Sequence, residues 1–163
     1  MNATQPLIPT ALWLALFPIT FLMHFAEEYW AGEGYPAYLF RIRGVELSTT
    51  RFVTLQVIGF VLTVAGCVIS RQLRFGEIMA LILGGAVLAN GITHSLTAIR
   101  DGRYGPGLVV SAAIWIPLGI STFFVMFPRV SHLQFILSTL GGLAINGVVA
   151  LLAMRGGRLD RKV

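Results

Sequence analysis

The first apolar segment of the chain, residues 8–30, reads IPTALWLALFPITFLMHFAEEYW. A transmembrane helix needs about 20 mostly apolar residues, and no charged residue interrupts this segment before Glu27. No basic region precedes the segment and no small-residue cleavage site follows it, so a retained helix is predicted rather than a signal peptide. The chain therefore opens with a predicted membrane span, and three ionisable residues, His24, Glu27 and Glu28, lie at the end of that span.

The composition of the whole chain also indicates a membrane protein. Of its 163 residues, 56% are hydrophobic and 12% are charged, and the mean hydropathy is +0.79. Soluble domains usually carry about a quarter charged residues. The net charge of +5 does not indicate nucleic-acid binding, because the basic residues lie between apolar segments and at the C-terminus, where they set membrane topology. The single cysteine, Cys67, excludes an intrachain disulfide and a Cys-rich zinc site.

Five segments are long and apolar enough to span a bilayer: approximately residues 8–30, 51–70, 76–99, 107–127 and 131–154. Alternating polarity is absent, which argues against a β-barrel. The predicted fold is an all-α integral membrane protein, in which residues 1–163 form a single domain with a bundle of five transmembrane helices. The longest connection, residues 31–50, mixes aromatic residues with arginines and predicts a short interfacial element.

The distribution of basic residues predicts the orientation of this bundle. Three of them lie on one side of the membrane: Arg71, Arg74 and Arg129. The other nine lie on the opposite side: Arg41, Arg43, Arg51, Arg100, Arg103, Arg155, Arg158, Arg161 and Lys162. Because basic residues accumulate on the cytoplasmic side, we expect the N-terminus outside and the C-terminus in the cytoplasm.

Polar residues of the first and third spans are predicted to meet. His24, Glu27 and Glu28 share one face of a helix, and His94 shares a stripe of the third span with Asn90. At a rise of 1.5 Å per residue, His24 lies about 9 Å and His94 about 10 Å from the midpoints of their helices, both towards the cytoplasm. Their similar depth predicts that the two stripes face each other.

Simpler interpretations of these polar residues remain open. Either glutamate alone is compatible with a solvated helix end, and the two histidines are compatible with a purely structural His–Glu hydrogen-bond network. Gln56, near the cytoplasmic end of the second span, is also compatible with a hydrogen bond between helices. The small residues Gly84 and Gly85 are expected to let the third helix approach its neighbours closely.

Four motifs in this order resemble a known family. His24-Phe25-Ala26-Glu27-Glu28 resembles the signature of the membrane proteins named for their HXXEE motif. The stretch ANGITH, residues 89–94, resembles the Asn-x-x-x-His segment of that family. The stretch RYGPG, residues 103–107, resembles its Tyr-x-Pro-Gly turn, and Pro117 matches a proline in the following helix. The resemblance covers most of the chain from His24 to Pro117. It implies a small bacterial multi-span protein of the cytoplasmic (inner) membrane, and it implies no particular activity.

A metal site is the first functional hypothesis. His24, Glu27, Glu28 and His94 would supply two imidazoles and two carboxylates from a helix pair, a set that suits zinc, iron or manganese. We therefore expect a membrane-embedded, metal-dependent enzyme that acts on a lipid-like or apolar substrate near the cytoplasmic face. The candidate catalytic residues are Glu27, Glu28 and His94. The candidate substrate-binding residues are Asn90, Gln56 and Tyr104.

Two other classes of function stay open at this stage. The first is a metal-free isomerase or cyclase of a lipid or isoprenoid, in which one desolvated glutamate holds a proton and the other stabilises positive charge. The second is a binding or transport protein without catalysis. Five spans cannot form an even inverted repeat in one chain, and a homodimer is compatible with such a protein.

Overall fold

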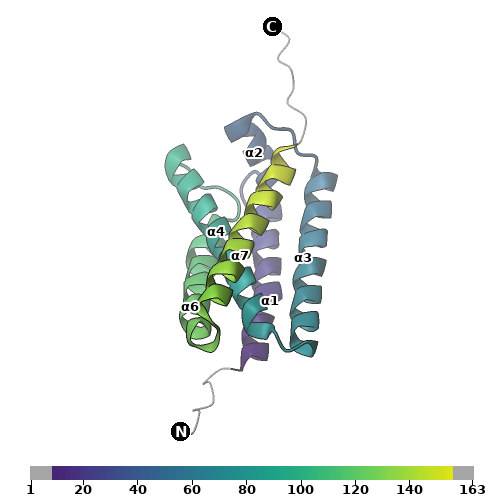
Figure 1. The fold of residues 1–163 in the computed structure, drawn as a ribbon. Helices are drawn as coiled ribbons and strands as arrows, with labels where there is room; N and C mark the ends of the chain where they lie inside the picture. Colours follow the sequence, from purple (N-terminus) through teal and green to yellow (C-terminus); the bar gives the residue numbers. More distant parts are fainter. Residues whose placement is uncertain (1–8, 156–163) are drawn as a thin grey trace, which may run out of the picture.

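The computed structural model describes residues 9–155, and the regular secondary structure of this part is helical (Figure 1). Five helical segments are long and apolar enough to cross a membrane: Thr10–Trp30, Thr49–Gln72, Gly76–Asp101, Leu108–Arg129 and His132–Met154. The predicted all-α bundle of five transmembrane helices is confirmed, with boundaries that shift by no more than two residues. Arg158, Arg161 and Lys162, on which the orientation depends in part, lie outside the described residues, and the orientation stays a prediction.

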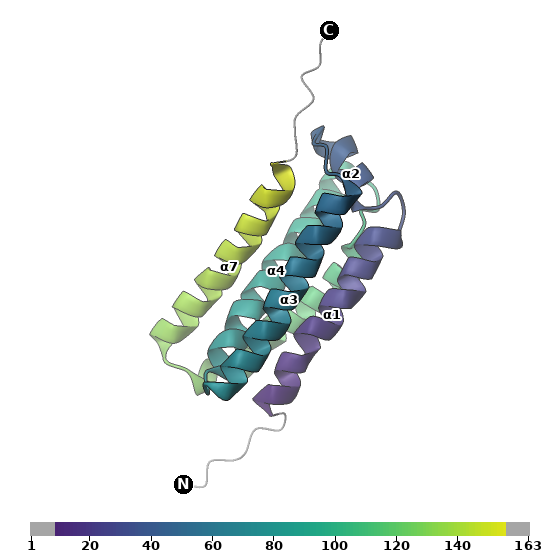
Figure 2. The same cartoon turned by 90° about the vertical axis from the view of Figure 1, so that its right-hand side faces the viewer.

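Four of the five spans are single helices, whereas the fourth span in chain order is built from several short helical pieces. The single helices are α1 (Thr10–Trp30), α3 (Thr49–Gln72), α4 (Gly76–Asp101) and α7 (His132–Met154). The fourth span consists of α5 (Leu108–Val110), a π-helical turn η1 (Ser111–Trp115), α6 (Ile116–Met126) and a 3-10 turn η2 (Phe127–Arg129). The predicted short element between the first two spans is the helix α2 (Tyr35–Arg43), which lies at the end of the bundle where α1 and α4 end (Figures 1 and 2).

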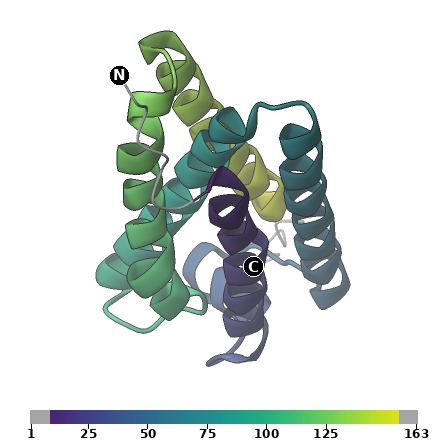
Figure 3. The same cartoon turned by 90° about the horizontal axis from the view of Figure 1, so that it is seen from below.

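Helix α4 is the centre of the bundle, because it packs against α1, α3, α6 and α7. Seen along the bundle, α1 and α4 lie between α6 on one side and α3 on the other (Figure 3). The closest approach is to α7, where a Cβ on Gly142 would lie 2.2 Å from the carbonyl oxygen of Ile82. A Cβ on Gly85 would lie 2.9 Å from the carbonyl oxygen of Thr139. The predicted close packing of the third span through small residues is therefore confirmed.

The outer surface of the bundle is apolar, as lipid contact requires. Large apolar side chains are exposed on every span, for example Leu62 on α3, which is 65% exposed, and Phe124 on α6, which is 79% exposed. Some polar side chains inside the bundle bond to one another: the indole N–H of Trp13 donates to the hydroxyl of Thr122 at 2.8 Å. The protein thus presents apolar side chains to lipid and keeps polar groups inside the bundle.

The π-helical turn of the fourth span has a physical cause in Pro117. Proline has no N–H, so the helix cannot continue its regular hydrogen bonds at this position, and π-turns commonly occur at such places. Here the N–H of Ile116 bonds to the carbonyl of Ser111, five residues earlier. The wider turn buries Ser111 and Trp115 at the level where α1 and α4 meet.

Candidate functional site

Three ionisable side chains from two helices meet inside the bundle. His24 and Glu28 lie one turn apart on α1 and are 2% and 3% exposed, and the side chain of His94 on α4 is 9% exposed. The Oε1 atom of Glu28 lies 3.5 Å from Nε2 of His24 and 3.3 Å from Nε2 of His94. The centres of the two imidazole rings are 5.0 Å apart. The predicted meeting of the two polar stripes is confirmed, and we call His24, Glu28 and His94 the triad.

The geometry of the triad fits a metal ion. One ligand atom from each residue lies within 4.8 Å of the other two. In a tetrahedral zinc site the metal–ligand distance is about 2.0–2.1 Å, and two ligand atoms therefore lie roughly 3.4 Å from each other. The two distances from the glutamate oxygen to the histidine nitrogens have this length. Two imidazoles and one carboxylate are also the ligand set of many non-haem iron sites.

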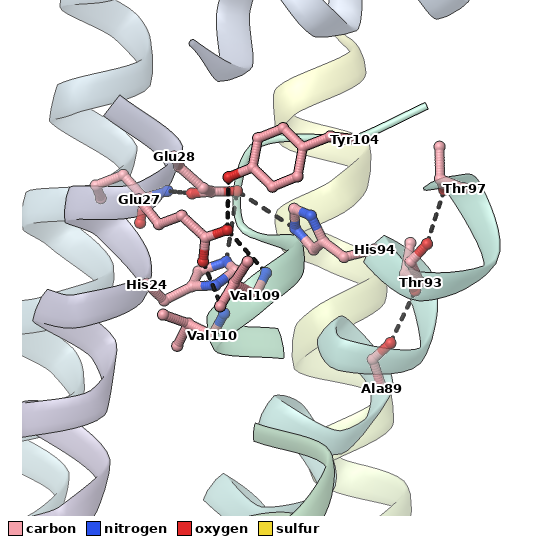
Figure 4. A network of polar contacts seen from close by, with 11 residues as sticks. His24, Glu27, Glu28, Ala89, Thr93, His94, Thr97, Tyr104, Val109 and Val110 are labelled. Atoms are coloured by element: carbon pink, nitrogen blue, oxygen red, sulfur yellow. Dashed lines mark hydrogen bonds and ion pairs between the residues drawn. The ribbon is translucent and has the colours of Figure 1, made fainter. Parts of the chain in front are cut away.

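The neighbouring glutamate, Glu27, lies in a different environment (Figure 4). Its Oε1 atom accepts hydrogen bonds from the hydroxyl of Tyr104 at 2.7 Å and from the backbone N–H of Val109 at 2.8 Å. Its Oε2 atom accepts from the backbone N–H of Val110 at 2.7 Å. A carboxylate at a helix N-terminus binds free N–H groups and complements the helix dipole. The structure therefore does not bring Glu27 into the triad, although the sequence predicts it as a ligand and catalytic residue.

We expect Glu27→Gln to destabilise the protein. The substitution removes the negative charge and one acceptor oxygen at the start of the fourth span, and such a loss costs about 1–2 kcal/mol. Thermal unfolding in detergent should show a lower midpoint than wild type. Glu33→Gln is a control of equal chemistry, because Glu33 pairs with Arg41 at the exposed surface and should change the midpoint much less. Equal midpoints for Glu27→Gln and wild type would contradict the capping role.

The candidate substrate-binding residues fall in three different places. The side-chain amide of Gln56, on α3, donates a hydrogen bond to Oε2 of Glu28, so Gln56 orients the triad carboxylate. Tyr104 donates to Glu27, and burial together with this hydrogen bond raises the pKa of its phenol. The Oδ1 atom of Asn90 is buried and has no hydrogen-bond partner among the described residues. Of the three, Gln56 contacts the triad directly.

Three residues that were not among the predicted site residues surround the triad. The ring of Trp115 stacks on His24 with centres 3.8 Å apart, and the ring of Tyr35 lies 5.8 Å from that of His94. Burial, and then the charge of Glu28, raise the pKa of the Tyr35 phenol. Gly107 has a φ of +87°, and its backbone lies directly on the triad. The RYGPG motif is a sequence signal for Gly107. No sequence pattern distinguishes Trp115 or Tyr35 from aromatic residues that only pack in the bundle.

Several buried polar atoms around the triad have no hydrogen-bond partner in the described part of the chain. They are Nδ1 and Nε2 of His24, Oδ1 of Asn90, Oγ of Ser111 and Nε1 of Trp115. Asn90 lies on α4, and Ser111 and Trp115 lie on η1. These two elements are in contact, because a Cβ on Gly91 of α4 would lie 3.2 Å from the carbonyl oxygen of Ser111. Buried polar groups are nearly always bonded to protein, water or a ligand. Their concentration here favours a site that receives water, an ion or a polar group.

Ion pairs and close packing hold helix α2 at the end of the bundle where α1 and α4 end. Arg41 on α2 forms ion pairs with Glu33 at 2.8 Å and with Asp101, the last residue of α4, at 2.9 Å. The side chain of Tyr38 lies against Gly105, where a Cβ would lie 2.8 Å from the phenol ring. The short helix and the loop before α5 therefore lie together beside the triad.

Comparison with known proteins gives a family match. A family model described as a protein of unknown function with an HXXEE motif matches residues 15–122. This range includes all three residues of the triad, Glu27 and both glycines of the RYGPG turn. No curated protein matches the chain, and no solved structure matches it.

Proposed function

Because this chain belongs to the family of HXXEE-motif proteins, whose function is unknown, we propose its function from its own site. We infer a membrane-embedded, metal-dependent enzyme that acts on a lipid-like or apolar substrate. The observation that carries the proposal is the triad, in which one carboxylate oxygen lies 3.3 and 3.5 Å from two imidazole nitrogens inside a transmembrane bundle. Zinc, iron or manganese is the metal class that this ligand set takes.

The distances in the triad favour a shared ion over a simple hydrogen-bond network. An N–H···O hydrogen bond has a donor–acceptor distance of about 2.7–3.2 Å. The 3.5 Å contact between the Glu28 oxygen and Nε2 of His24 is longer than this, and that nitrogen has no hydrogen bond among the described residues. A cation that the three atoms share would satisfy the two imidazole nitrogens and the carboxylate together. Neutral imidazole and ionised carboxylate are the forms that bind a metal.

The surroundings of the triad would tune such a centre. Gln56 holds the second oxygen of Glu28, and Trp115 holds the plane of the His24 ring. A bound metal would supply Lewis-acid activation of a substrate oxygen or of water. The residues of this chain would position that chemistry inside the bundle, where little water competes.

The apolar setting supports a lipid-like substrate. The triad lies between helices whose outer surfaces carry exposed leucine, isoleucine and phenylalanine side chains. A substrate that reaches the site from the bilayer must itself be largely apolar. With the predicted orientation, the site would lie near the cytoplasmic face of the inner membrane of a bacterium.

The metal-free alternative is weakened because only one of the two glutamates, Glu28, lies in the triad. That mechanism needs one glutamate that holds a proton and a second that stabilises positive charge. Glu27 accepts three hydrogen bonds at a helix N-terminus and lies outside the triad, so it does not pair with Glu28 and the two histidines. Glu28 alone would then have to perform both roles, so the geometry favours the metal-dependent function.

The proposal is tested on wild-type protein purified without chelator and reconstituted into lipid vesicles. We expect one zinc, iron or manganese ion per chain, which is lost as the pH falls because protons compete for the imidazoles and the carboxylate. Mass spectrometry of the vesicle lipids should show a product that disappears after chelation and returns when the metal is restored. Protein that stays metal-free after incubation with each ion would overturn the proposal. A lipid product that persists after complete metal removal would favour acid–base catalysis by Glu28.

A further inference from the structure

A second polar site lies at the end of the bundle opposite to the triad. A cleft of about 310 Å³ opens there between the start of α1, the end of α3 and the start of α4. Its apolar and small lining residues are Ala11, Leu14 and Gly76, and its polar ones are Thr10, Ser70, Arg71, Arg74 and Glu77. Helix α2 lies at the other end of the same helices (Figure 2), and the triad residues lie in the second halves of α1 and α4, so this cleft is separate from the proposed metal site.

The two arginines of the cleft have no carboxylate partner within ion-pair distance in residues 9–155. The ion pairs of this part of the chain involve Arg41 and the two triad histidines, and neither Arg71 nor Arg74 takes part in one. Arg74 has a φ of +60° in the tight turn between α3 and α4, where glycine would be the usual residue. Two guanidinium groups beside one cleft provide the bidentate donors that phosphate oxygens require.

Glu77, the acidic residue of the cleft, adds a negative group. Oε1 of Glu77 accepts a hydrogen bond from the hydroxyl of Thr10 at 2.8 Å, and that hydroxyl also receives a hydrogen bond from Arg129 at 3.3 Å. The carboxylate is thus anchored at the wall of the cleft, on the first turn of α4. A ligand with both a phosphate and an ammonium group would complement the arginines and Glu77 together.

The position of the cleft identifies the source of such a ligand. It lies where three apolar spans end, at the depth where lipid headgroups meet the protein. We propose that this cleft binds the headgroup of a zwitterionic aminophospholipid, with the phosphodiester at Arg71 and Arg74 and the ammonium group at Glu77. This binding does not depend on the function proposed for the triad.

Native mass spectrometry in detergent tests the proposal with phosphatidylethanolamine as the probe. Wild-type protein should retain the lipid, whereas diacylglycerol with the same acyl chains should bind much less. The double variant Arg71→Gln/Arg74→Gly should lose roughly tenfold in affinity, because it removes both guanidinium groups. Glycine at position 74 suits the left-handed backbone, so this variant is expected to fold. Arg103→Gln, an exposed arginine at the triad end, is the matched control and should bind like wild type.

Three results would overturn the inference. The first is equal retention of phosphatidylethanolamine by wild type and by the folded double variant. The second is equal retention of diacylglycerol and phosphatidylethanolamine, which would mean that acyl chains alone are bound. The third is arginine-dependent binding of inorganic phosphate without binding of the phospholipid, which would assign the cleft to a free anion.

Discussion

His94→Ala is expected to reduce the metal content of the purified protein to background. The substitution removes one of three ligands, and even the loss of a residue that merely supports a ligand weakens metal affinity by about 10–100-fold. We therefore expect a loss of more than about 100-fold, measured by elemental analysis of monodisperse protein in detergent. His24→Ala should have the same effect, and it also removes the ring that stacks on Trp115.

The third histidine of the chain provides the matched control. His132 is exposed at the start of α7, at the opposite end of the bundle from the triad, and its ring stacks on Phe127. His132→Ala should retain the full metal content. Metal retained by folded His94→Ala, or lost equally by His132→Ala, would show that the triad is not the binding site.

Gly107→Ala is expected to disrupt the triad without removing any of its side chains. A Cβ at this position would lie 2.7 Å from Cε1 of His24, 2.9 Å from Cε1 of His94 and 3.1 Å from Cγ of Glu28. The two distances to the imidazole rings are shorter than carbon atoms approach one another, so the rings must move, and the tight contact with Glu28 shifts its side chain slightly. Displacement of ligands from their geometry should weaken metal affinity by at least about 10–100-fold, which metal titration of the apoprotein would measure.

Gly102→Ala separates this steric effect from backbone strain. Gly102 has a φ of +66°, similar in sign to that of Gly107, but a Cβ there would meet no atom within 4 Å. Both variants should therefore lose about 1 kcal/mol of stability through the left-handed backbone, while Gly102→Ala keeps its metal affinity. Equal metal affinity in the two variants would contradict the close contact between the RYGPG turn and the triad.

The membrane spans could be predicted from sequence because they depend on local properties. Each span needs a run of apolar residues as long as the bilayer is thick, and the backbone within it must satisfy its own hydrogen bonds. Helical periodicity then placed His24 and Glu28 on one face, and counting residues placed His94 at the same depth. These steps require no knowledge of which helices are neighbours, and all of them agree with the structure.

The tertiary structure alone determines that Glu28 joins the triad and that Glu27 binds the start of the fourth span. Positions 27 and 28 follow His24 by three and four residues, so both are adjacent to it on the helix, yet they differ by about 100° around the axis. Helix α4 brings His94 to the side of Glu28, and the start of the fourth span lies on the side of Glu27. Which glutamate meets which neighbour depends on where other helices pack, and that arrangement is not encoded in the local sequence around the motif.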